Sequence, residues 1–223
     1  MLHIKISLPL LLVSTLLLGG CQAKSNAHGQ GEQKPSEMKK EDLPKTRAFQ
    51  DSFTRTFLTS TKEVKKGYYP FESKTKRYTM DFPTGGIVSD IDYQQKKNDF
   101  EFLLAGISYE DQSGGSLDLT YDSGIVNKNV KYELFALKAK ASGTTEFKKM
   151  NIENKIVYWM PVNLSDGYYT YTGYIHPKGK NGGVEVIYSS KCQSENGICK
   201  SFNVDTAQSR FMSIIRSVKF TDG

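Results

Sequence analysis

Histidine and cysteine, on which most nucleophilic and metal-dependent sites are built, are scarce in this sequence. Its 223 residues include three of each. His3 falls in a leader-like segment and His28 in a polar one, so only His176 could serve a folded domain. A Ser-His-Asp triad would need His176, yet no serine near it lies in a G-x-S-x-G context, and P-loop and dinucleotide motifs are missing. We interpret His176 as a solvated loop residue and expect no cofactor.

A long apolar run is also missing. The longest, Leu8 to Leu18, contains Pro9 and is shorter than the roughly 20 apolar residues that span a bilayer. With Lys5 before it, this run is typical of a secretion signal that is removed from the mature protein. We therefore expect residues 1–20 to be a signal peptide and the mature chain to work outside the cytoplasm.

The signal ends in Leu18-Gly19-Gly20-Cys21, which resembles the bacterial lipobox. In that family the cysteine is diacylated and the chain is cut just before it. The resemblance therefore implies that Cys21 is the lipidated N-terminus of a protein on the extracytoplasmic face of the cell membrane, in a Gram-positive bacterium given the lysine-rich tail. Two acyl chains give stable anchoring, whereas one binds only marginally. The alternative is an ordinary secretion signal with a chance cysteine.

The other two cysteines, Cys192 and Cys199, flank a turn-like sequence, Glu195-Asn196-Gly197. In an oxidising compartment this spacing predicts a disulfide. A redox pair usually has the shorter C-x-x-C spacing, and no histidine lies near enough in the sequence to complete a zinc site. We therefore expect Cys192 and Cys199 to staple a short loop.

Residues 21–45 contain almost no apolar side chains, so we expect a disordered tether with an end-to-end distance of about 25 to 30 Å. The folded domain is expected at 46–223. Phe49, Phe53 and Phe57 recur at helical spacing and predict one amphipathic helix that packs on the core.

The rest of the domain alternates strands with two further helices. The mid-chain helix is expected at 129–143, with Val130, Leu134 and Leu137 facing inward. Strands are expected at 77–83, 86–95, 99–111, 145–152, 155–164, 167–177, 182–190 and 217–220, with a hairpin tip at 96–98 between the second and the third. A closing helix is expected at 204–217, with Phe211, Ile214 and Ile215 facing inward. This pattern indicates a single α+β domain, an antiparallel sheet flanked by helices.

The succession of "YTMDFP", a mid-chain helix ending in "ASG", long strands and a terminal helix running into "SVKF" resembles the PsbP/DcrB-like superfamily. The resemblance covers about residues 66 to 221. It implies an extracytoplasmic or accessory protein that binds other proteins or assists assemblies and has no shared catalytic centre. The expected helix with Phe49 departs from the family pattern.

A tyrosine-rich strand offers the most suggestive binding surface. Alternation places Tyr168, Thr170, Thr172 and Tyr174 on one face of the strand. We predict that Tyr168 and Tyr174 contact an envelope protein or a wall polymer. The alternative is that helices cover these rings. Nucleic acid is not an expected partner, because no compact run of arginines is present. The mature net charge of 29 minus 24, or +5, fits an anionic membrane or wall as well as a solvated surface.

The rival hypothesis is a cofactor-free hydrolase of cell-wall material that uses a carboxylate pair. Asp90 and Asp92 are two apart on an expected strand, and Glu101 is a third candidate. Acidic turns could also offer oxygen ligands to calcium, but the EF-hand pattern is missing. Because carboxylates are common on solvated sheet faces, we favour binding without catalysis and predict no catalytic residue and no metal ligand.

Overall fold

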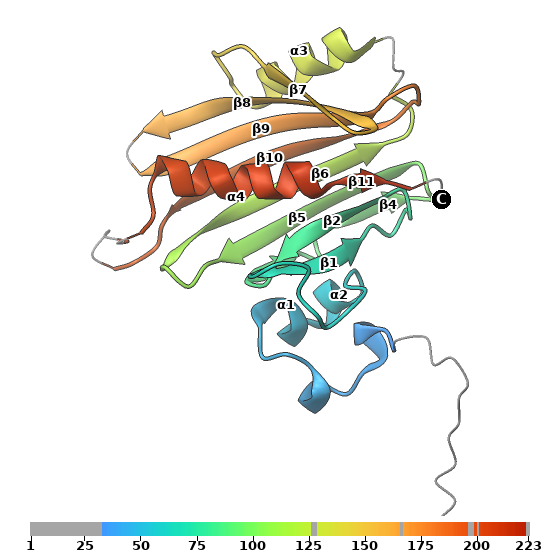
Figure 1. The fold of residues 1–223 in the computed structure, drawn as a ribbon, viewed down its shortest axis with the longest axis vertical. Coiled ribbons are helices and arrows are strands. Elements are labelled where there is room, and N and C mark those ends of the chain that lie inside the picture. Colours follow the sequence, from blue (N-terminus) through green and yellow to red (C-terminus); the bar gives the residue numbers. More distant parts are fainter. Residues whose placement is uncertain (1–32, 126–128, 166, 196–198, 200, 222–223) are drawn as a thin grey trace, which may run out of the picture. The chain divides into compact units, whose positions relative to one another are not determined.

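The computed structural model describes residues 33–125, 129–165, 167–195, 199 and 201–221. Most strands form one antiparallel sheet with the order β3-β5-β6-β10-β9-β8-β7, and β4 pairs with β5 beside β3 (Figure 1). The strands are β3 (Gly86–Val88), β4 (Gln94–Lys96), β5 (Phe100–Ser108), β6 (Ser113–Asp122), β7 (Lys148–Ile152), β8 (Lys155–Ser165), β9 (Tyr168–Pro177) and β10 (Gly183–Cys192).

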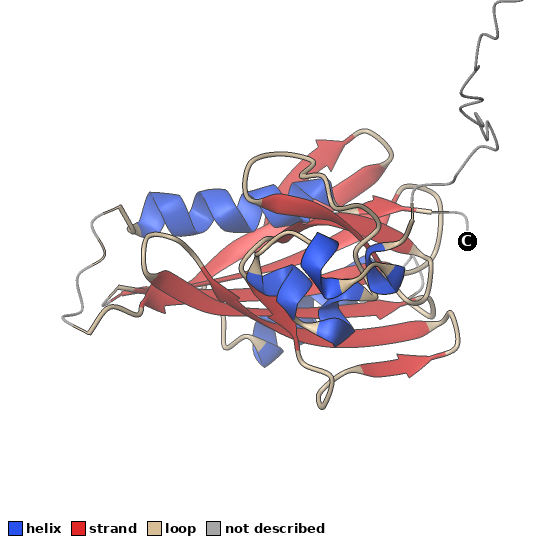
Figure 2. Cartoon of the chain, turned by 90° about the horizontal axis from the view of Figure 1, so that it is seen from below, coloured by secondary structure: helices blue, strands red, loops and turns tan. Residues whose placement is uncertain are grey.

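A second, smaller sheet lies on one face of the first. It has the order β1-β2-β11, with β1 (Tyr68–Glu72), β2 (Tyr78–Pro83) and β11 (Lys219–Phe220). Helix α4 (Val204–Ser217) covers the same face beside β2, and α3 (Val130–Lys140) packs on β9 from the opposite face. Figure 2 shows the long helix α4 above the layer of strands. The α+β class holds, but a single sheet flanked by helices was too simple.

The main core lies between the large sheet and the layer formed by α4 and the small sheet. Alternate residues of the central strands point into it, because side chains on a strand alternate between its faces. Phe211, Ile214 and Ile215 of α4 meet them and are fully buried, as predicted. Burying one such side chain stabilises the fold by about 1.5–3 kcal/mol. The inward residues of the sheet include Leu103, Leu117, Leu119, Val157, Tyr171, Val186 and Tyr188.

The single helix predicted around Phe49 is two short helices, α1 (Arg47–Gln50) and α2 (Ser52–Arg55). Asp51 has an extended backbone and its carboxylate accepts a hydrogen bond from the backbone N–H of Thr54 at 2.7 Å, so it caps a new helix instead of continuing the first. Phe49 and Phe57 nevertheless enter the core, where the Phe49 ring contacts Tyr69 with centroids 4.5 Å apart.

The packed body begins before residue 46. Two 3-10 turns, η1 (Pro35–Glu37) and η2 (Lys40–Asp42), precede α1, and Leu43 is only 5% exposed. Leu43 and Pro35 supply the buried apolar surface that holds this segment to the body. The tether predicted for 21–45 was therefore too long at its C-terminal end, and its residues 21–32 lie outside the described residues.

The hairpin predicted around residues 96–98 is present as β4 and β5. Helix α3 also forms within the predicted range, and the three residues predicted to face inward all pack on one cluster. Leu137 is buried, Val130 and Leu134 are partly buried, and the aromatic rings of Tyr132 and Phe135 are 71% and 72% exposed. Helix α3 is thus apolar on both its inner and its outer face.

Candidate functional site: the groove along helix α4

Helix α4 is fixed at both ends and along its inner face. The side chain of Asn203 accepts a hydrogen bond from the Thr206 N–H at 2.9 Å and caps the first turn. The Phe211 ring stacks on Tyr171 with centroids 5.3 Å apart. At the other end, the buried ammonium group of Lys155 donates to the carbonyl oxygens of Arg216 (2.6 Å) and Val218. Unpaired carbonyls at a helix end are thereby satisfied.

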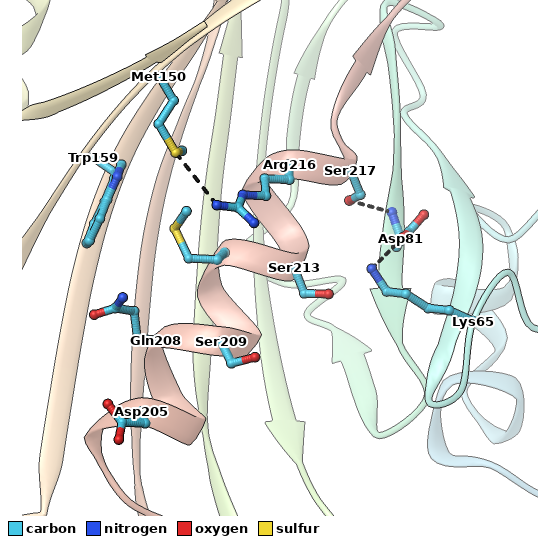
Figure 3. A pocket seen from close by; sticks show the side chains of 11 residues that line it. Lys65, Asp81, Met150, Trp159, Asp205, Gln208, Ser209, Ser213, Arg216 and Ser217 are labelled. Atoms are coloured by element: carbon cyan, nitrogen blue, oxygen red, sulfur yellow. Dashed lines mark hydrogen bonds and ion pairs between the residues drawn. The ribbon is translucent and has the colours of Figure 1, made fainter. Parts of the chain in front are cut away.

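An open groove of about 790 Å³ follows the outer side of α4 (Figure 3). Ser209, Ser213 and Ser217 are spaced four residues apart and form a stripe of hydroxyl groups, which we call the serine stripe. Opposite the stripe, Lys65 and Asp81 supply charged groups from the small-sheet side. The other wall of the groove is formed by Met150, Trp159, Met212 and Arg216.

The charged groups of the groove are largely paired within the protein. The Lys65 ammonium lies 2.7 Å from an Asp81 carboxylate oxygen and 4.5 Å from the centre of the Tyr68 ring. The backbone N–H of Asp81 donates to the Ser217 hydroxyl at 2.9 Å. On the other wall, a guanidinium nitrogen of Arg216 lies 3.9 Å from the Met150 sulfur. The groove therefore offers hydroxyl, ionic and apolar contacts side by side.

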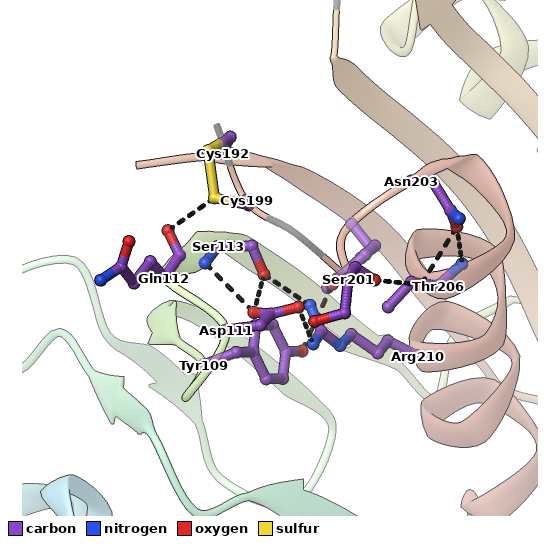
Figure 4. A network of polar contacts seen from close by, with 11 residues as sticks. Tyr109, Asp111, Gln112, Ser113, Cys192, Cys199, Ser201, Asn203, Thr206 and Arg210 are labelled. Atoms are coloured by element: carbon purple, nitrogen blue, oxygen red, sulfur yellow. Dashed lines mark hydrogen bonds and ion pairs between the residues drawn. A yellow bond between two sulfur atoms is a disulfide. The ribbon is translucent and has the colours of Figure 1, made fainter. Parts of the chain in front are cut away.

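A second hollow of about 570 Å³ lies between the β5–β6 turn and the segment that follows β10, beside an arginine network. The Arg210 guanidinium donates to Asp111 (2.9 Å) and to Ser113 (2.6 Å) and lies 3.6 Å from the centre of the Tyr109 ring (Figure 4). Burial alone would raise the pKa of Asp111, but the hydrogen bonds from Ser113 and the charge of Arg210 outweigh this effect, so the pKa lies below its ordinary value. This network ties α4 to the turn between β5 and β6.

The predicted disulfide between Cys192 and Cys199 is present in the structure, next to this network (Figure 4). It joins the end of β10 to the segment that leads into α4. The Gln193 N–H donates to the Gln112 carbonyl at 2.9 Å, so the stapled loop is also bound to the β5–β6 turn. The disulfide therefore helps to place the first turn of α4.

The two tyrosines predicted to bind a partner lie in different environments. Tyr168 is 41% exposed at the start of β9, whereas Tyr174 is 1% exposed beneath α3, where it packs with Leu137. A partner cannot reach Tyr174 while α3 is in place. The two rings therefore do not form one accessible surface, and contact at Tyr168 stays a prediction.

The carboxylates considered for hydrolysis lie in different environments. Asp90 and Asp92 are exposed in the loop between β3 and β4 rather than on a strand, and Glu101 is buried on β5. Glu101 accepts hydrogen bonds from the Lys74 N–H and the Tyr93 hydroxyl, both at 2.8 Å. Burial raises the pKa of Glu101, although these hydrogen bonds oppose the shift. Its contacts are those of a residue that joins the β1–β2 turn to the large sheet.

His176 was predicted to be a solvated loop residue, and this was wrong. It lies on β9, is 4% exposed, and stacks between Tyr158 and Tyr174 with centroid distances of 6.0 and 5.7 Å. Its Nδ1 lies 3.1 Å from the Pro177 carbonyl oxygen, which can only accept a hydrogen bond. Burial lowers the pKa of His176. In the described part of the chain, no three His, Cys, Asp or Glu side chains cluster as metal ligands would.

Comparison with known proteins places the chain in a family. A sequence model of the family described as "Putative lipoprotein YvcA" matches residues 44–219. The chain belongs to this family. A protein of Bacillus subtilis (strain 168) with the same description is 30% identical over 226 residues, which cover 92% of this chain and 91% of the relative. No solved structure matches the chain significantly.

The name of this lipoprotein family agrees with the lipoprotein predicted from the sequence. Cys21 lies outside the described residues. Within the described ranges, no helix has both the length and the apolar character needed to cross a bilayer.

The groove was not predicted from the sequence. The serine stripe could have been found, because Asp205, Ser209, Ser213 and Ser217 repeat every fourth residue on a predicted helix whose other residues are largely apolar. The pairing of Lys65 with Asp81 has no comparable signal, since it depends on how the turn before β1 folds back against β2.

Proposed function

We propose that this protein is anchored by lipid at Cys21 on the outer face of the cell membrane and acts there as a binding or assembly-accessory module without catalysis. The family description and the lipobox-like sequence at Leu18–Cys21 support the anchor. The observation that carries the binding role is the open groove along α4, with its serine stripe. The partner we propose is an extended segment of another envelope protein.

The shape of the groove favours an extended partner. Small-molecule sites are usually concave and bury most of their ligand, whereas this groove is open along a helix of 14 residues, about 21 Å long. The exposed hydroxyl of Ser209 can exchange hydrogen bonds with a polypeptide backbone, whereas the Ser217 hydroxyl already donates to the Ile214 carbonyl at 2.7 Å. Met150 and Met212 offer an adaptable apolar surface on the other side of the groove.

The charge of the groove also favours a partner without high charge. The ammonium of Lys65 and the guanidinium of Arg216 are balanced by the carboxylates of Asp81 and Asp205. A polyanionic wall polymer would find little net attraction there. The PsbP/DcrB-like resemblance of residues 66 to 221 points to the same kind of work, since it implies an accessory protein that binds other proteins.

The alternative of a cell-wall hydrolase has less support. A carboxylate pair needs a separation of about 5 to 9.5 Å across a shared substrate site. Glu101 is enclosed and engaged by three donors, the Lys74 N–H and the hydroxyls of Thr75 and Tyr93, while Asp92 bonds to Ser89 in an exposed loop. We therefore propose binding in preference to hydrolysis.

The anchor is tested by replacing Cys21 with serine. The variant should leave the membrane fraction or stay unprocessed, and metabolic labelling with a fatty acid should be lost. Normal processing with retained membrane association and label would refute attachment at Cys21.

The groove is tested by placing a photo-crosslinking residue at Ser209 in cells, with Ala136 on the exposed side of α3 as the matched control position. A discrete adduct is expected at 209 but not at 136. The replacement Gln208→Arg in the same helix should abolish that adduct, because a long cation then occupies the groove. Equal crosslinking at 209 and 136, or an adduct that Gln208→Arg leaves unchanged, would show that the groove is not the binding site.

A further inference from the structure

Positive charge is concentrated in one short part of the chain. Residues 33–67 contain nine lysines and arginines against five carboxylates, a net charge of +4. Residues 68–223 contain nineteen against eighteen, a net charge of +1. Nearly all of the net charge of the mature chain therefore belongs to the segment that follows the proposed tether.

This segment forms one end of the described body. Figure 1 shows η1, η2, α1 and α2 together at that end, and α3 at the opposite end. The turn at residues 62–67 joins them through hydrogen bonds, since Thr84 N–H donates to the Gly67 carbonyl at 3.0 Å and Ala48 N–H donates to the Thr84 carbonyl at 3.1 Å. The charge is thus collected in space as well as in sequence.

Five exposed lysines of this segment, Lys34, Lys39, Lys40, Lys45 and Lys66, define what we call the basic end. Among the described residues, none of their ammonium groups takes part in an ion pair. They are therefore available to an anionic partner.

The surface around these lysines also carries apolar and acidic groups. A hollow of about 490 Å³ lies between Lys40 and Lys45 and includes the edge of Leu43. Val64, in the neighbouring turn, is 52% exposed. The carboxylates of Glu37, Glu41, Asp42 and Glu63 are interspersed with the lysines and, together with Asp51, reduce the net charge to the +4 given above.

We propose that the basic end rests on the anionic headgroups of the bilayer that holds the anchor. The inference relies on the proposed attachment at Cys21 for its proximity. Cys21 and Gln33 are twelve positions apart in the sequence, so the chain between them can span at most about 43 Å. At physiological salt, attraction between exposed charges is screened beyond about 8 Å. The tether therefore has to bring the lysines close to the membrane surface before the anionic headgroups can hold them there.

This contact is strong enough to act as a second membrane-binding element beside the lipid anchor. Each lysine close to an anionic surface strengthens binding about fivefold. Val64 can add a small apolar contact with the headgroup region. In this orientation α3, with the exposed rings of Tyr132 and Phe135, is turned away from the bilayer.

The test uses the whole mature chain, residues 21–223, with Cys21→Ser so that no acyl chain is present. Sedimentation with vesicles measures the partition coefficient, on phosphatidylcholine alone and on a mixture with about one third phosphatidylglycerol. We expect binding only to the anionic vesicles and at least about a tenfold loss when the salt is raised from about 0.1 M to about 1 M.

Two matched triple variants locate the surface. Lys39→Glu/Lys40→Glu/Lys45→Glu should weaken binding about a hundredfold or more, by the fivefold effect of each lysine. The control Lys96→Glu/Lys97→Glu/Lys131→Glu makes the same change in net charge at exposed positions elsewhere and should retain binding within about threefold. Circular dichroism verifies that all variants are folded.

Three results would overturn the proposal: no preference for anionic vesicles, an equal loss of binding in the two triple variants, or stronger capture by immobilised poly(glycerol phosphate) than by the vesicles. Because the probe protein carries no lipid, none of these results bears on acylation at Cys21 or on the α4 groove, which have separate tests.

Discussion

The packing of α4 is tested most directly by replacing Phe211 with alanine. The Phe211 ring is fully buried and lies among Tyr171, Tyr188 and Trp159, with centroid distances of 5.3, 6.3 and 6.3 Å. Because these neighbours belong to three different strands, they cannot close together over the space that the ring leaves. Phe-to-Ala changes at such sites cost about 3–5 kcal/mol. For a body of this size each kcal/mol lowers Tm by about 2–4 °C, so we expect a decrease of about 6–20 °C.

The assay is thermal unfolding followed by circular dichroism, together with urea unfolding to obtain the free energy directly. The matched control is Phe135→Ala on α3, where the same ring is 72% exposed and removal should change stability by about 0.5 kcal/mol at most. The variant Phe211→Leu should fall between the two. If Phe211→Ala cost less than about 1 kcal/mol, or no more than Phe135→Ala, α4 could not be seated on the sheet as described.

Four further predictions concern polar and covalent contacts. Glu101→Ala removes the acceptor shared by three buried or partly buried donors and should cost about 2–4 kcal/mol in urea unfolding, whereas Glu101→Gln should cost less. Burial raises the pKa of Glu101 above its ordinary value of 4.5, so the folded state binds the proton of this carboxyl group more tightly than the unfolded state does. The free energy of unfolding should therefore fall as the pH rises above about 4.5, and Glu101→Gln should flatten that slope. Burial lowers the pKa of Lys155 to about 8, so the unfolded chain binds more protons between about pH 8 and 10; stability should rise with pH there, and Lys155→Met should remove the rise. Reducing the disulfide between Cys192 and Cys199 should cost about 2.5 kcal/mol, and a gain of two mass units on reduction would verify the bond; unchanged stability after complete reduction would contradict its role in placing α4.

Much of the fold could be predicted because local patterns and tertiary packing agree. The alternation of Tyr78, Met80 and Phe82 gave β2, and the positions of Phe211 and Ile214 gave the inward face of α4. In each case one face of the element is covered along its whole length, so the apolar period is clean.

The predictions failed where a local signal competed with the period or where long-range packing decided the outcome. Asp51 interrupts the Phe49 series because its carboxylate caps a new helix. The sequence places Tyr168 and Tyr174 on the same face of β9, but it does not show that α3 covers only one of them. His176 next to Pro177 resembles a loop, yet it ends a strand that lies between two others.

The candidate site was the least predictable part. The serine stripe follows a simple helical period. It becomes one side of a groove only because Lys65 and Asp81, from a turn and a strand of the small sheet, lie opposite it. Their ion pair is not encoded in the spacing of the two residues. A surface assembled from three elements of different sequence position appears only once the topology is known.

The order of strands has a consequence for how the chain folds. Neighbouring strands β6 and β10 pair Asp122 with Gly183, and α3 and β7 to β9 lie between them in sequence. Until β10 arrives, β6 keeps one row of backbone donors and acceptors open, and an edge of that kind recruits other chains. Pairing of strands so distant in sequence is also slow. The partly folded chain therefore exposes an open strand edge for as long as β10 is unpaired, and association with other chains competes with folding during that interval.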